Sequence, residues 1–294
     1  MSRFLVTGLS GFAGGYLAKE LSRCGHEILR TDCDLGDVAA VSTALAGLDP
    51  DYVVHLAAVS HVAHGNPEDF YRVNVVGTAN LLRVLAEKPR RPRKVILAGS
   101  ANVYGNTGLS TPLPESTSFR PENHYGTSKA AMEMIAATYR DALPLVIARP
   151  FNFTGPEQAP SFLIPKLVAA FSMRAPSVAL GNIDIARDFS DVRDVARGFR
   201  ILAEKASPGT VFNLCSGKAL SFREIFDMLA EISGHRPEIV RDPALVRANE
   251  IATLCGDPSA FDALAGNEDG RRIPFRDTLA GMLASSSDNP RKTS

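Results

Sequence analysis

The sequence predicts a doubly wound α/β fold followed by a smaller, partly helical lobe. Short apolar segments bounded by turn residues alternate with longer helical patterns through residues 1–150, as they do in a parallel sheet with helices on both faces. The apolar segments are hydrophobic at almost every position, which is typical of strands buried on both sides. A glycine-rich turn also joins the first strand to the first helix.

The elements of this first part follow a regular order along the chain. Between turn residues, apolar runs predict strands at residues 3–8, 26–32, 51–58, 94–100 and 144–150. The longer segments between them predict helices at residues 14–25, 37–47, 73–87 and 128–142. A dense basic run at 87–94 contains prolines between a helix and a strand, so we interpret it as a solvated loop.

After residue 150 the regularity gives way to loops rich in Pro, Gly and Asn. We expect helices near 162–173, 221–233 and 275–283, and a strand at 210–215. The predicted organisation is a dinucleotide-binding domain at 1–150, a substrate lobe at 151–284 with some segments returning to the first domain, and a tail at 285–294. The tail has no apolar anchor, so we expect it to be disordered.

The composition excludes several classes of protein. The 294 residues include 32 basic and 32 acidic ones, so no overall field favours nucleic acid or an anionic membrane. No apolar run approaches the roughly 20 residues of a membrane helix. The four cysteines are scattered, without the spacing of a metal site, and we interpret them as reduced thiols of a soluble cytoplasmic protein.

Three glycines, Gly8, Gly11 and Gly14, lie between the first strand and the first helix, with Phe12 among them. Glycine lets the backbone approach a ligand, and a helix N-terminus presents free N–H groups to a pyrophosphate. The spacing is G-x-x-G-x-x-G, not the common G-x-G-x-x-G, and three glycines can also serve turns and packing. The strand before and the helix after favour a dinucleotide site.

The next two strands supply further candidate cofactor residues. The strand at 26–32 ends where an acid would bind a ribose 2′-hydroxyl and an arginine a 2′-phosphate. Arg30 and Asp32 both occur there, so the choice between NAD and NADP stays open. His55 by itself is expected to be a buried structural histidine. Small residues after it would let the cofactor lie against the backbone of Leu56, Ala57 and Ala58.

A serine, a tyrosine and a lysine form the candidate catalytic set. Tyr125 and Lys129 are four residues apart, so a helix would place them on one face. An apolar strand delivers Ser100 to its carboxyl end. Lys129 and an oxidised nicotinamide would lower the pKa of Tyr125, which would exchange a proton with a substrate alcohol or ketone while Ser100 bonds the same oxygen. The pattern Y-x-x-x-K alone occurs by chance in many helices. The prediction depends on its combination with Ser100 and with the glycine turn.

Several motifs together resemble the extended short-chain dehydrogenase/reductase family of nucleotide-sugar epimerases, dehydratases and reductases. The matching segments are 6–14, 53–58, 74–78, 99–105, 125–129, 148–156 and 187–195. The resemblance implies a Rossmann-type domain with the glycine turn at the pyrophosphate. It implies that Asp34 and Leu35 flank the adenine, that Asn74 contacts the cofactor, and that Tyr125 and Lys129 do so as well as acting in catalysis.

The resemblance also implies a substrate. The run at 180–195 is similar to the GDP-mannose branch of the family, which includes 4,6-dehydratases and 4-keto-6-deoxymannose reductases. In that branch an Arg-x-x-Glu contacts the nucleotide; a solvated charged pair is the alternative interpretation of the matching residues here. Gly99, where the family often has a second serine, departs from the pattern. The implied substrate residues are Ser100, Asn102, Asn152, Arg187, Arg247 and Glu250.

The residue two beyond the serine helps to choose a reaction. A dehydratase needs an acid there, and Asn102 cannot donate or accept a proton at neutral pH. Residues 152–162 contain no histidine, so a double epimerisation lacks its base. We therefore predict NAD(P)H-dependent reduction of the C4 ketone of GDP-4-keto-6-deoxy-D-mannose to GDP-D-rhamnose or GDP-6-deoxy-D-talose.

Two alternatives stay open at this point. One is an NAD-dependent nucleotide-sugar 4-epimerase, and the other is a cofactor-binding scaffold protein without catalysis. We expect no metal, no nucleic acid and no membrane partner. Family members are often dimers through the helix that carries Tyr125, and the apolar circumference of residues 130–139 is compatible with a homodimer.

Overall fold

The computed structural model describes the whole chain except residues 61–65, 110, 247–250, 270–271 and 288–294. Its centre is a six-stranded parallel sheet in the order β2-β1-β3-β4-β5-β9. The strands are β1 (Arg3–Thr7), β2 (Glu27–Arg30), β3 (Tyr52–His55), β4 (Lys94–Ala98), β5 (Leu145–Pro150) and β9 (Val211–Leu214). The strand order reverses between β1 and β3, where doubly wound sheets bind their ligands. The predicted fold class is confirmed.

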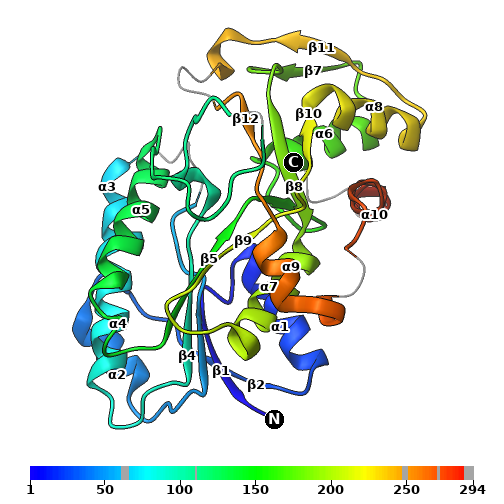
Figure 1. Ribbon diagram of the computed structural model, residues 1–294. Helices are drawn as coiled ribbons and strands as arrows, with labels where there is room; N and C mark the ends of the chain where they lie inside the picture. The colour runs from blue at the N-terminus through cyan, green and yellow to red at the C-terminus, as the bar shows by residue number, and fades with distance from the viewer. Residues whose placement is uncertain (61–65, 110, 247–250, 270–271, 288–294) are drawn as a thin grey trace.

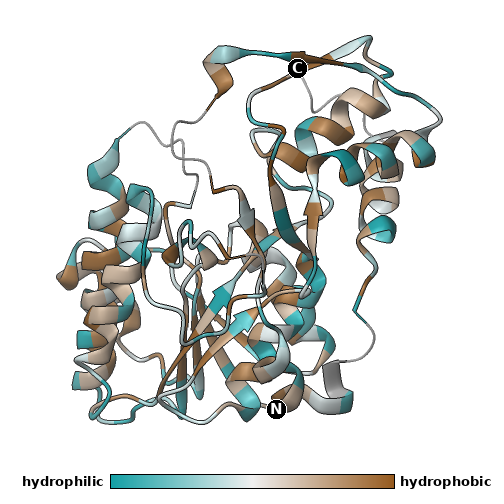
Figure 2. Cartoon of the chain, turned by 45° about the horizontal axis from the view of Figure 1, so that its top comes forward, coloured by the Kyte–Doolittle hydropathy of each residue, from teal (hydrophilic) through white to brown (hydrophobic). Residues whose placement is uncertain are grey.

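Helices cover both faces of this sheet (Figure 1). One face carries α1 (Phe12–Arg23) and α7 (Val192–Lys205); the other carries α2 (Val38–Leu45), α4 (Thr78–Glu87) and α5 (His124–Ala137). Alternate residues of each strand enter opposite cores, so Val54 packs with α1 and α7 while Val53 packs with α2 and α4. Figure 2 shows the hydrophobic colouring of the central strands. Burial on both sides explains their continuous apolar sequence.

The helix predicted at 73–87 begins earlier than expected. Asn66 caps α3 (Pro67–Tyr71) through its side chain, with Pro67 at the first helical position. The chain then continues through a π-helical segment, η1 (Arg72–Gly77), into α4. The π-helical turn brings Asn74, which is fully buried, to the loop after β3.

The second lobe lies beyond the carboxyl ends of the parallel strands (Figure 1). Its main strand, β8 (Ala186–Asp191), pairs with β6 (Asn152–Thr154), β10 (Ala219–Ser221) and β12 (Thr253–Leu254). A second pair joins β7 (Ser177–Leu180) and β11 (Glu238–Arg241). The lobe also contains α6 (Leu163–Ser172), α8 (Phe222–Ser233), η3 (Pro243–Leu245) and α10 (Phe275–Ser287). Its core lies among α6, α8 and α10.

Segments after residue 150 also complete the first domain. Helix α7 and strand β9 pack on the central sheet, and α9 (Ser259–Ala265), followed by η4 (Gly266–Asp269), covers β9. At the other end, α10 continues to Ser287, into the segment predicted as a tail from residue 285. The hydroxyls of Ser285 and Ser286 donate to the carbonyls of Gly281 and Met282, four residues earlier in the helix.

Candidate active site

The glycine turn after β1 has no room for side chains. Gly8 has a φ of +73°, and a Cβ there would lie 2.7 Å from the Ala57 nitrogen. A Cβ on Gly14 would lie 2.3 Å from the Gly8 oxygen. Gly11 is the N-cap of α1, no side chain caps that helix, and its first turn has no acidic residue. The turn therefore fits a pyrophosphate held by backbone N–H groups.

Phe12, the first residue of α1, points toward the second lobe. Its ring stacks on Phe153 of β6, with centroids 6.1 Å apart, and meets Tyr16 edge-on. A Cβ on Gly155 would come within 3.7 Å of the Phe12 ring. The side chain thus joins the glycine turn to the second lobe, and its predicted contact with the cofactor stays a prediction.

The residues expected at the adenosine end lie after β2. Arg30 and Asp32 are exposed. Asp34 accepts from the Gly36 nitrogen at 2.8 Å and pairs with Arg72 at 2.7 Å, and the hydrogen bond from Arg72 holds the pKa of Asp34 below its usual value. Sequence analysis missed Arg72, which reaches this turn from η1. Leu35 is buried, and its carbonyl accepts from the Asn80 side chain at 2.8 Å.

The end of β3 supplies the opposite wall of the glycine turn. Leu56, Ala57 and Ala58 are half-buried, and the Ala57 nitrogen donates to the Thr7 hydroxyl at 3.3 Å. His55 is buried with one ring nitrogen 2.6 Å from the Thr7 hydroxyl and the other 2.9 Å from that of Thr78. Burial lowers the pKa of His55 to about 3. The expectation of a structural histidine is confirmed.

Asn74 is buried beneath the loop that follows β3. Its amide oxygen accepts from the Val59 nitrogen at 2.9 Å, and its amide nitrogen donates to the Val59 oxygen and the Ser128 hydroxyl. The side chain has no exposed surface. The amide holds the loop after β3 against α5, and the predicted contact of Asn74 with the cofactor stays a prediction.

The structure brings Ser100 and Tyr125 together. Ser100 follows β4, and its side chain is placed to lower the pKa of the Tyr125 phenol, against the larger effect of burial. Asn123 caps α5 by accepting from the Gly126 nitrogen at 2.8 Å, which places Tyr125 in the first turn. A Cβ on Gly126 would lie 2.6 Å from the Asn102 oxygen. Glycine at this position lets the start of α5 approach the segment η2 (Ala101–Val103) that follows Ser100.

Lys129 lies one turn further along α5 and is 3% exposed. Its ammonium donates to the Ala98 oxygen at 2.7 Å. Burial lowers the pKa of Lys129 to about 8, against the opposing charge of Glu133. Burial also raises the pKa of Tyr125, although Ser100 acts in the other direction. The lowered pKa predicted for Tyr125 is thus not found in the protein alone, because desolvation of the phenolate dominates.

The residues expected to face a sugar nucleotide occupy several strands. Asn102 donates from its backbone and side-chain nitrogens to the Ser100 hydroxyl, both at 3.2 Å. Asn152, on β6, donates to the Asp188 oxygen at 3.4 Å. Arg187, on β8, is buried and donates to the oxygens of Ala186 and Ala252. The remaining two candidates, Arg247 and Glu250, lie outside the described residues.

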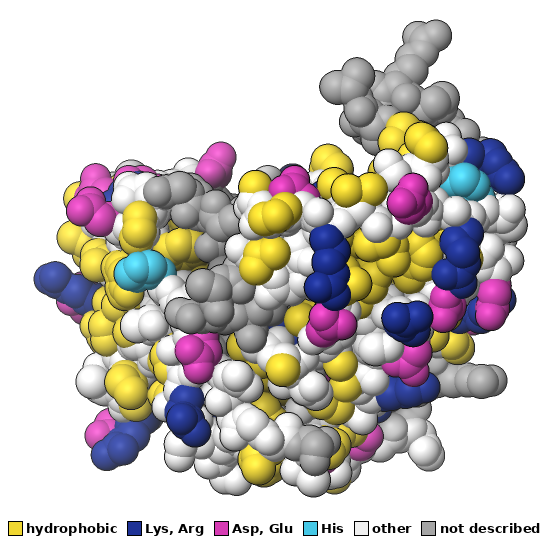
Figure 3. Space-filling view, turned by 90° about the horizontal axis from the view of Figure 1, so that it is seen from above, with side chains coloured by type: hydrophobic (Ala, Val, Ile, Leu, Met, Phe, Trp, Pro, Cys, Tyr) yellow, Lys and Arg dark blue, Asp and Glu magenta, His cyan; other side chains and the backbone are white. Residues whose placement is uncertain are grey.

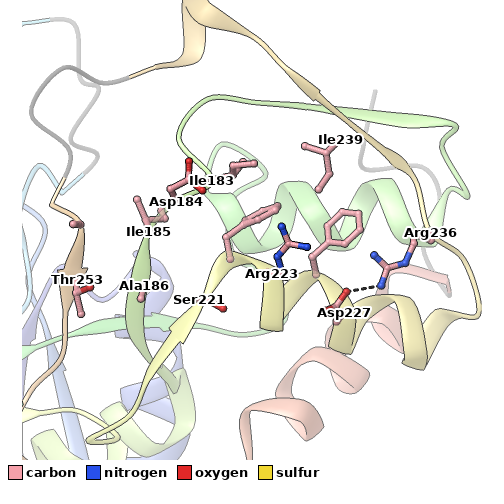
Figure 4. Close-up of a pocket in the computed structure, with 13 residues that line it drawn as sticks. Ile183, Asp184, Ile185, Ala186, Ser221, Arg223, Asp227, Arg236, Ile239 and Thr253 are labelled. Atoms are coloured by element: carbon pink, nitrogen blue, oxygen red, sulfur yellow. Dashed lines mark hydrogen bonds and ion pairs between the residues drawn. The ribbon is translucent and has the colours of Figure 1, made fainter. Parts of the chain in front are cut away.

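The second lobe has its own cavity of about 400 Å³. Figure 4 shows it between the start of β8 and the first turns of α8, with Arg223 over it and the ion pair of Asp227 and Arg236 beside it. Its apolar lining is formed by Ile183, Ile185, Phe222, Phe226 and Ile239. None of the predicted site residues that the structure describes lines this cavity. Seen from the carboxyl ends of the strands, hydrophobic side chains gather on this lobe between charged ones (Figure 3).

Three further observations concern the cysteines, possible metal ligands and the lengths of the helices. All four cysteines are free thiols. Within the described part of the chain, no group of three or more His, Cys, Asp or Glu side chains is placed to hold a metal ion. The helices described here are all too short or too polar to cross a membrane.

The fold and the glycine turn define a dinucleotide-binding protein, and Ser100, Tyr125 and Lys129 lie at the carboxyl end of β4, on the same edge of the sheet as that turn. Residues 4–215 match the NAD dependent epimerase/dehydratase family. The chain belongs to this family, which makes it an enzyme with NAD or NADP as its cofactor.

Two similar proteins are named for GDP-linked deoxysugars. The chain is 37% identical to GDP-6-deoxy-D-talose 4-dehydrogenase of Aggregatibacter actinomycetemcomitans, over 90% of this chain and 92% of that protein. It is 32% identical to GDP-6-deoxy-D-mannose reductase of Pseudomonas aeruginosa, over 96% of each. The solved structure of RMD from Pseudomonas aeruginosa with NADPH has a TM-score of 0.89 at 29% identity and covers 98% of this chain and 99% of that one.

Proposed function

We propose that the protein transfers hydride from NAD(P)H to C4 of GDP-4-keto-6-deoxy-D-mannose. The observation that carries this proposal is the placement of the Ser100 and Tyr125 side chains together at the carboxyl end of β4, where burial raises and Ser100 lowers the pKa of the phenol. Full-length similarity to two enzymes named for GDP-6-deoxyhexoses supports the substrate class. The family's other activities, epimerisation and dehydration, use the same kind of cofactor and define the alternatives to be tested.

The chain's own groups would each have one task. A bound reduced nicotinamide supplies the hydride. The Ser100 hydroxyl donates to the carbonyl oxygen of the substrate, and Tyr125 gives that oxygen its proton, so that ketone, hydride and proton together make the alcohol. Lys129 supports the phenolate that Tyr125 becomes, and a solvent proton restores the phenol. The raised pKa of Tyr125 suits this direction, because the group begins the reaction protonated.

Asn102 supports reduction over dehydration. Its two nitrogens donate to the Ser100 hydroxyl oxygen and so occupy the lone pairs of that oxygen. The hydroxyl proton of Ser100 is then left for Tyr125 or a substrate oxygen. An acid at position 102 would instead have to move a proton to eliminate water. The Asn102 amide is about as long as an aspartate side chain. It holds the Ser100 hydroxyl in place but cannot transfer a proton.

Two products are compatible with this chemistry. Hydride delivered to one face of C4 makes GDP-D-rhamnose, and delivery to the other makes GDP-6-deoxy-D-talose. The higher identity to the talose enzyme makes GDP-6-deoxy-D-talose the first product to look for. We further propose that the protein is a cytoplasmic homodimer, since its cysteines are free and Met134, on α5, is 62% exposed.

The test is turnover of GDP-4-keto-6-deoxy-D-mannose, generated enzymatically from GDP-mannose, with NADH and NADPH offered separately. Loss of the reduced cofactor's absorbance in proportion to the sugar, with a product assigned at C4 by NMR, is the expected result. Interconversion of GDP-hexoses without consumption of cofactor would make the protein a 4-epimerase instead. Cofactor binding without either reaction would favour the scaffold alternative.

A further inference from the structure

The helix α5 meets the end of β4 at three successive residues. Tyr125 lies beside Ser100, and Lys129 donates to the Ala98 oxygen. Between these two, Gly99 faces Glu133, since a Cβ on Gly99 would lie 2.7 Å from a carboxylate oxygen of Glu133. A side chain at position 99 in this conformation would therefore push Glu133 away.

Glu133 is a buried acid that the proposed reaction does not use. It is 8% exposed and lies one helical turn beyond Lys129 on the same face of α5. Arg149 of β5 donates to the Glu133 carboxylate from two guanidinium nitrogens, with the shortest distance at 2.7 Å. The pair is buried, with about 6% of each side chain exposed.

Arg149 is itself held from several sides. Another guanidinium nitrogen donates to the Tyr104 hydroxyl at 2.9 Å and to the Glu115 oxygen at 2.8 Å. The guanidinium also lies over the rings of Tyr104 and Phe119. The Tyr104 hydroxyl in turn donates to the Asn213 side chain on β9 at 2.7 Å. This network leaves the Glu133 side chain little freedom to rotate.

We propose that Glu133 is a positioning residue of the active site, whose carboxylate, fixed by Arg149 and admitted by Gly99, keeps the buried Lys129 in its ammonium form beside Ser100 and Tyr125. This inference rests on the proposed function. An ammonium buried without a counter-charge loses its proton readily. Glu133 is the charge that opposes the burial-driven fall in the pKa of Lys129.

The other groups around Lys129 do not replace Glu133. His55 is neutral, because burial lowers its pKa to about 3, and Tyr125 is neutral, because burial raises its pKa. His124, at the start of α5, is exposed. Of the segments packed against α5, α3, η1 and α4 carry charged residues on exposed or half-buried positions, namely Glu68, Asp69, Arg72, Arg83 and Glu87. Arg149 of β5 is a buried charge of the same sign as Lys129 and is paired with Glu133.

The first test is the pH dependence of keto-sugar reduction by Glu133→Gln. The ammonium of Lys129 is lost as the pH rises through its pKa, so the basic limb of the kcat profile should move to lower pH by about one unit or more. Glu133→Asp, which keeps the charge, should restore the basic limb toward the wild-type pH. Glu87→Gln, an exposed acid paired with Arg83, is the matched control and should leave the profile unchanged.

A second variant is needed in case Glu133→Gln does not fold. Glu133→Gln leaves the buried Arg149 without its partner, whereas Glu133→Gln with Arg149→Gln removes both charges. The double variant should also show a basic limb below that of the wild type. A folded single or double variant with the wild-type profile would overturn the inference.

The inference and the proposed function fail in different ways. The pH dependence of NADPH affinity, followed by the fluorescence of NADPH, reads the state of Lys129 without any keto sugar. If the wild type does not reduce the keto sugar, the proposed function fails, but a shift in this binding profile in Glu133→Gln still supports the role of Glu133. An unshifted binding profile in a folded variant counts against that role whatever the substrate.

Discussion

At the scale of single residues, burial raises the pKa of Tyr125 and lowers the pKa of Lys129 for the same physical reason. Desolvation penalises whichever form is charged, so the phenol keeps its proton more firmly and the ammonium holds its proton less firmly. Burial therefore moves the two pKa values apart, since that of Tyr125 rises from 10.0 and that of Lys129 falls from 10.5 to about 8. Before any ligand is present, the phenol keeps its proton at a pH at which the ammonium of Lys129 loses one.

Removal of the phenol tests its role directly. Tyr125→Phe should lower kcat for the keto sugar by about 10²- to 10⁴-fold, the usual share of a general acid. Its affinity for NADPH should stay close to that of the wild type. The measurement pairs steady-state kinetics with a fluorescence titration. A Tyr125→Phe enzyme that turns over at the wild-type rate would remove Tyr125 from the mechanism.

Lys129 also predicts a pH-dependent difference in stability. Its pKa falls from 10.5 to about 8 on folding, so the unfolded chain holds more protons between these values. Below pH 8, burial of the charged lysine lowers the free energy of unfolding by about 3 kcal/mol. This penalty disappears as the pH rises toward 10.5. At pH 7, Lys129→Met should therefore have a higher Tm than the wild type. The difference in Tm between the two proteins should become smaller as the pH is raised to about 10. The exposed Lys218→Met is the control, and an excess that stays constant with pH would contradict the prediction.

At the scale of elements, the turn from β1 into α1 offers two neighbouring glycines in different surroundings. Gly14 faces the Gly8 oxygen at a distance no Cβ tolerates, whereas a Cβ on Gly15 would meet nothing within 4 Å. Gly14→Ala should distort the turn and weaken NADPH binding by on the order of tenfold or more. Gly15→Ala should leave binding unchanged and stabilise the helix by up to about 1 kcal/mol. Equal affinities in the two variants would show that the turn does not hold the cofactor.

The elements that could be predicted from the sequence were those with local signals. The first five strands of the central sheet and the helices α1, α2 and α4 follow from apolar runs and turn residues, because burial on both faces leaves a continuous pattern. β8 was not expected as a strand, since Arg187 and Asp188 interrupt its apolar residues. Both charges are buried and bonded to distant backbone groups, a pairing that no local pattern indicates.

In the candidate site, too, the local relations could be predicted from the sequence and the contacts between distant residues could not. Ser100 and Tyr125 could be brought together from helix spacing and from the place of a strand end. The contact of Glu133 with Arg149 joins residues on different elements, and the pairing of Asp34 with Arg72 spans 38 positions. Only the spacing of Glu133 from Lys129, four residues on a helix, gave a sequence signal for the buried acid.

At the scale of the whole molecule, the exposed apolar surface of α5 bears on assembly. Met134 is 62% exposed on the helix that carries Tyr125. If two copies meet through this helix, Met134→Glu should convert the dimer to a monomer in sedimentation equilibrium, because a buried charge at the contact is costly. Exposed Met173→Glu, on the second lobe, is the control. A wild type that sediments as a monomer would end the proposal.

The sheet is completed by β9, which the chain reaches only after it has built most of the second lobe. A ribosome that has released residues 1–150 has therefore produced five strands with β5 as an open edge, and the surface later covered by α7 still faces water. Such an edge is a template for pairing with other chains. Nascent or truncated forms that stop before residue 214 should thus depend on chaperones, so expression screens that trim the second lobe will recover aggregates instead of a smaller cofactor-binding protein.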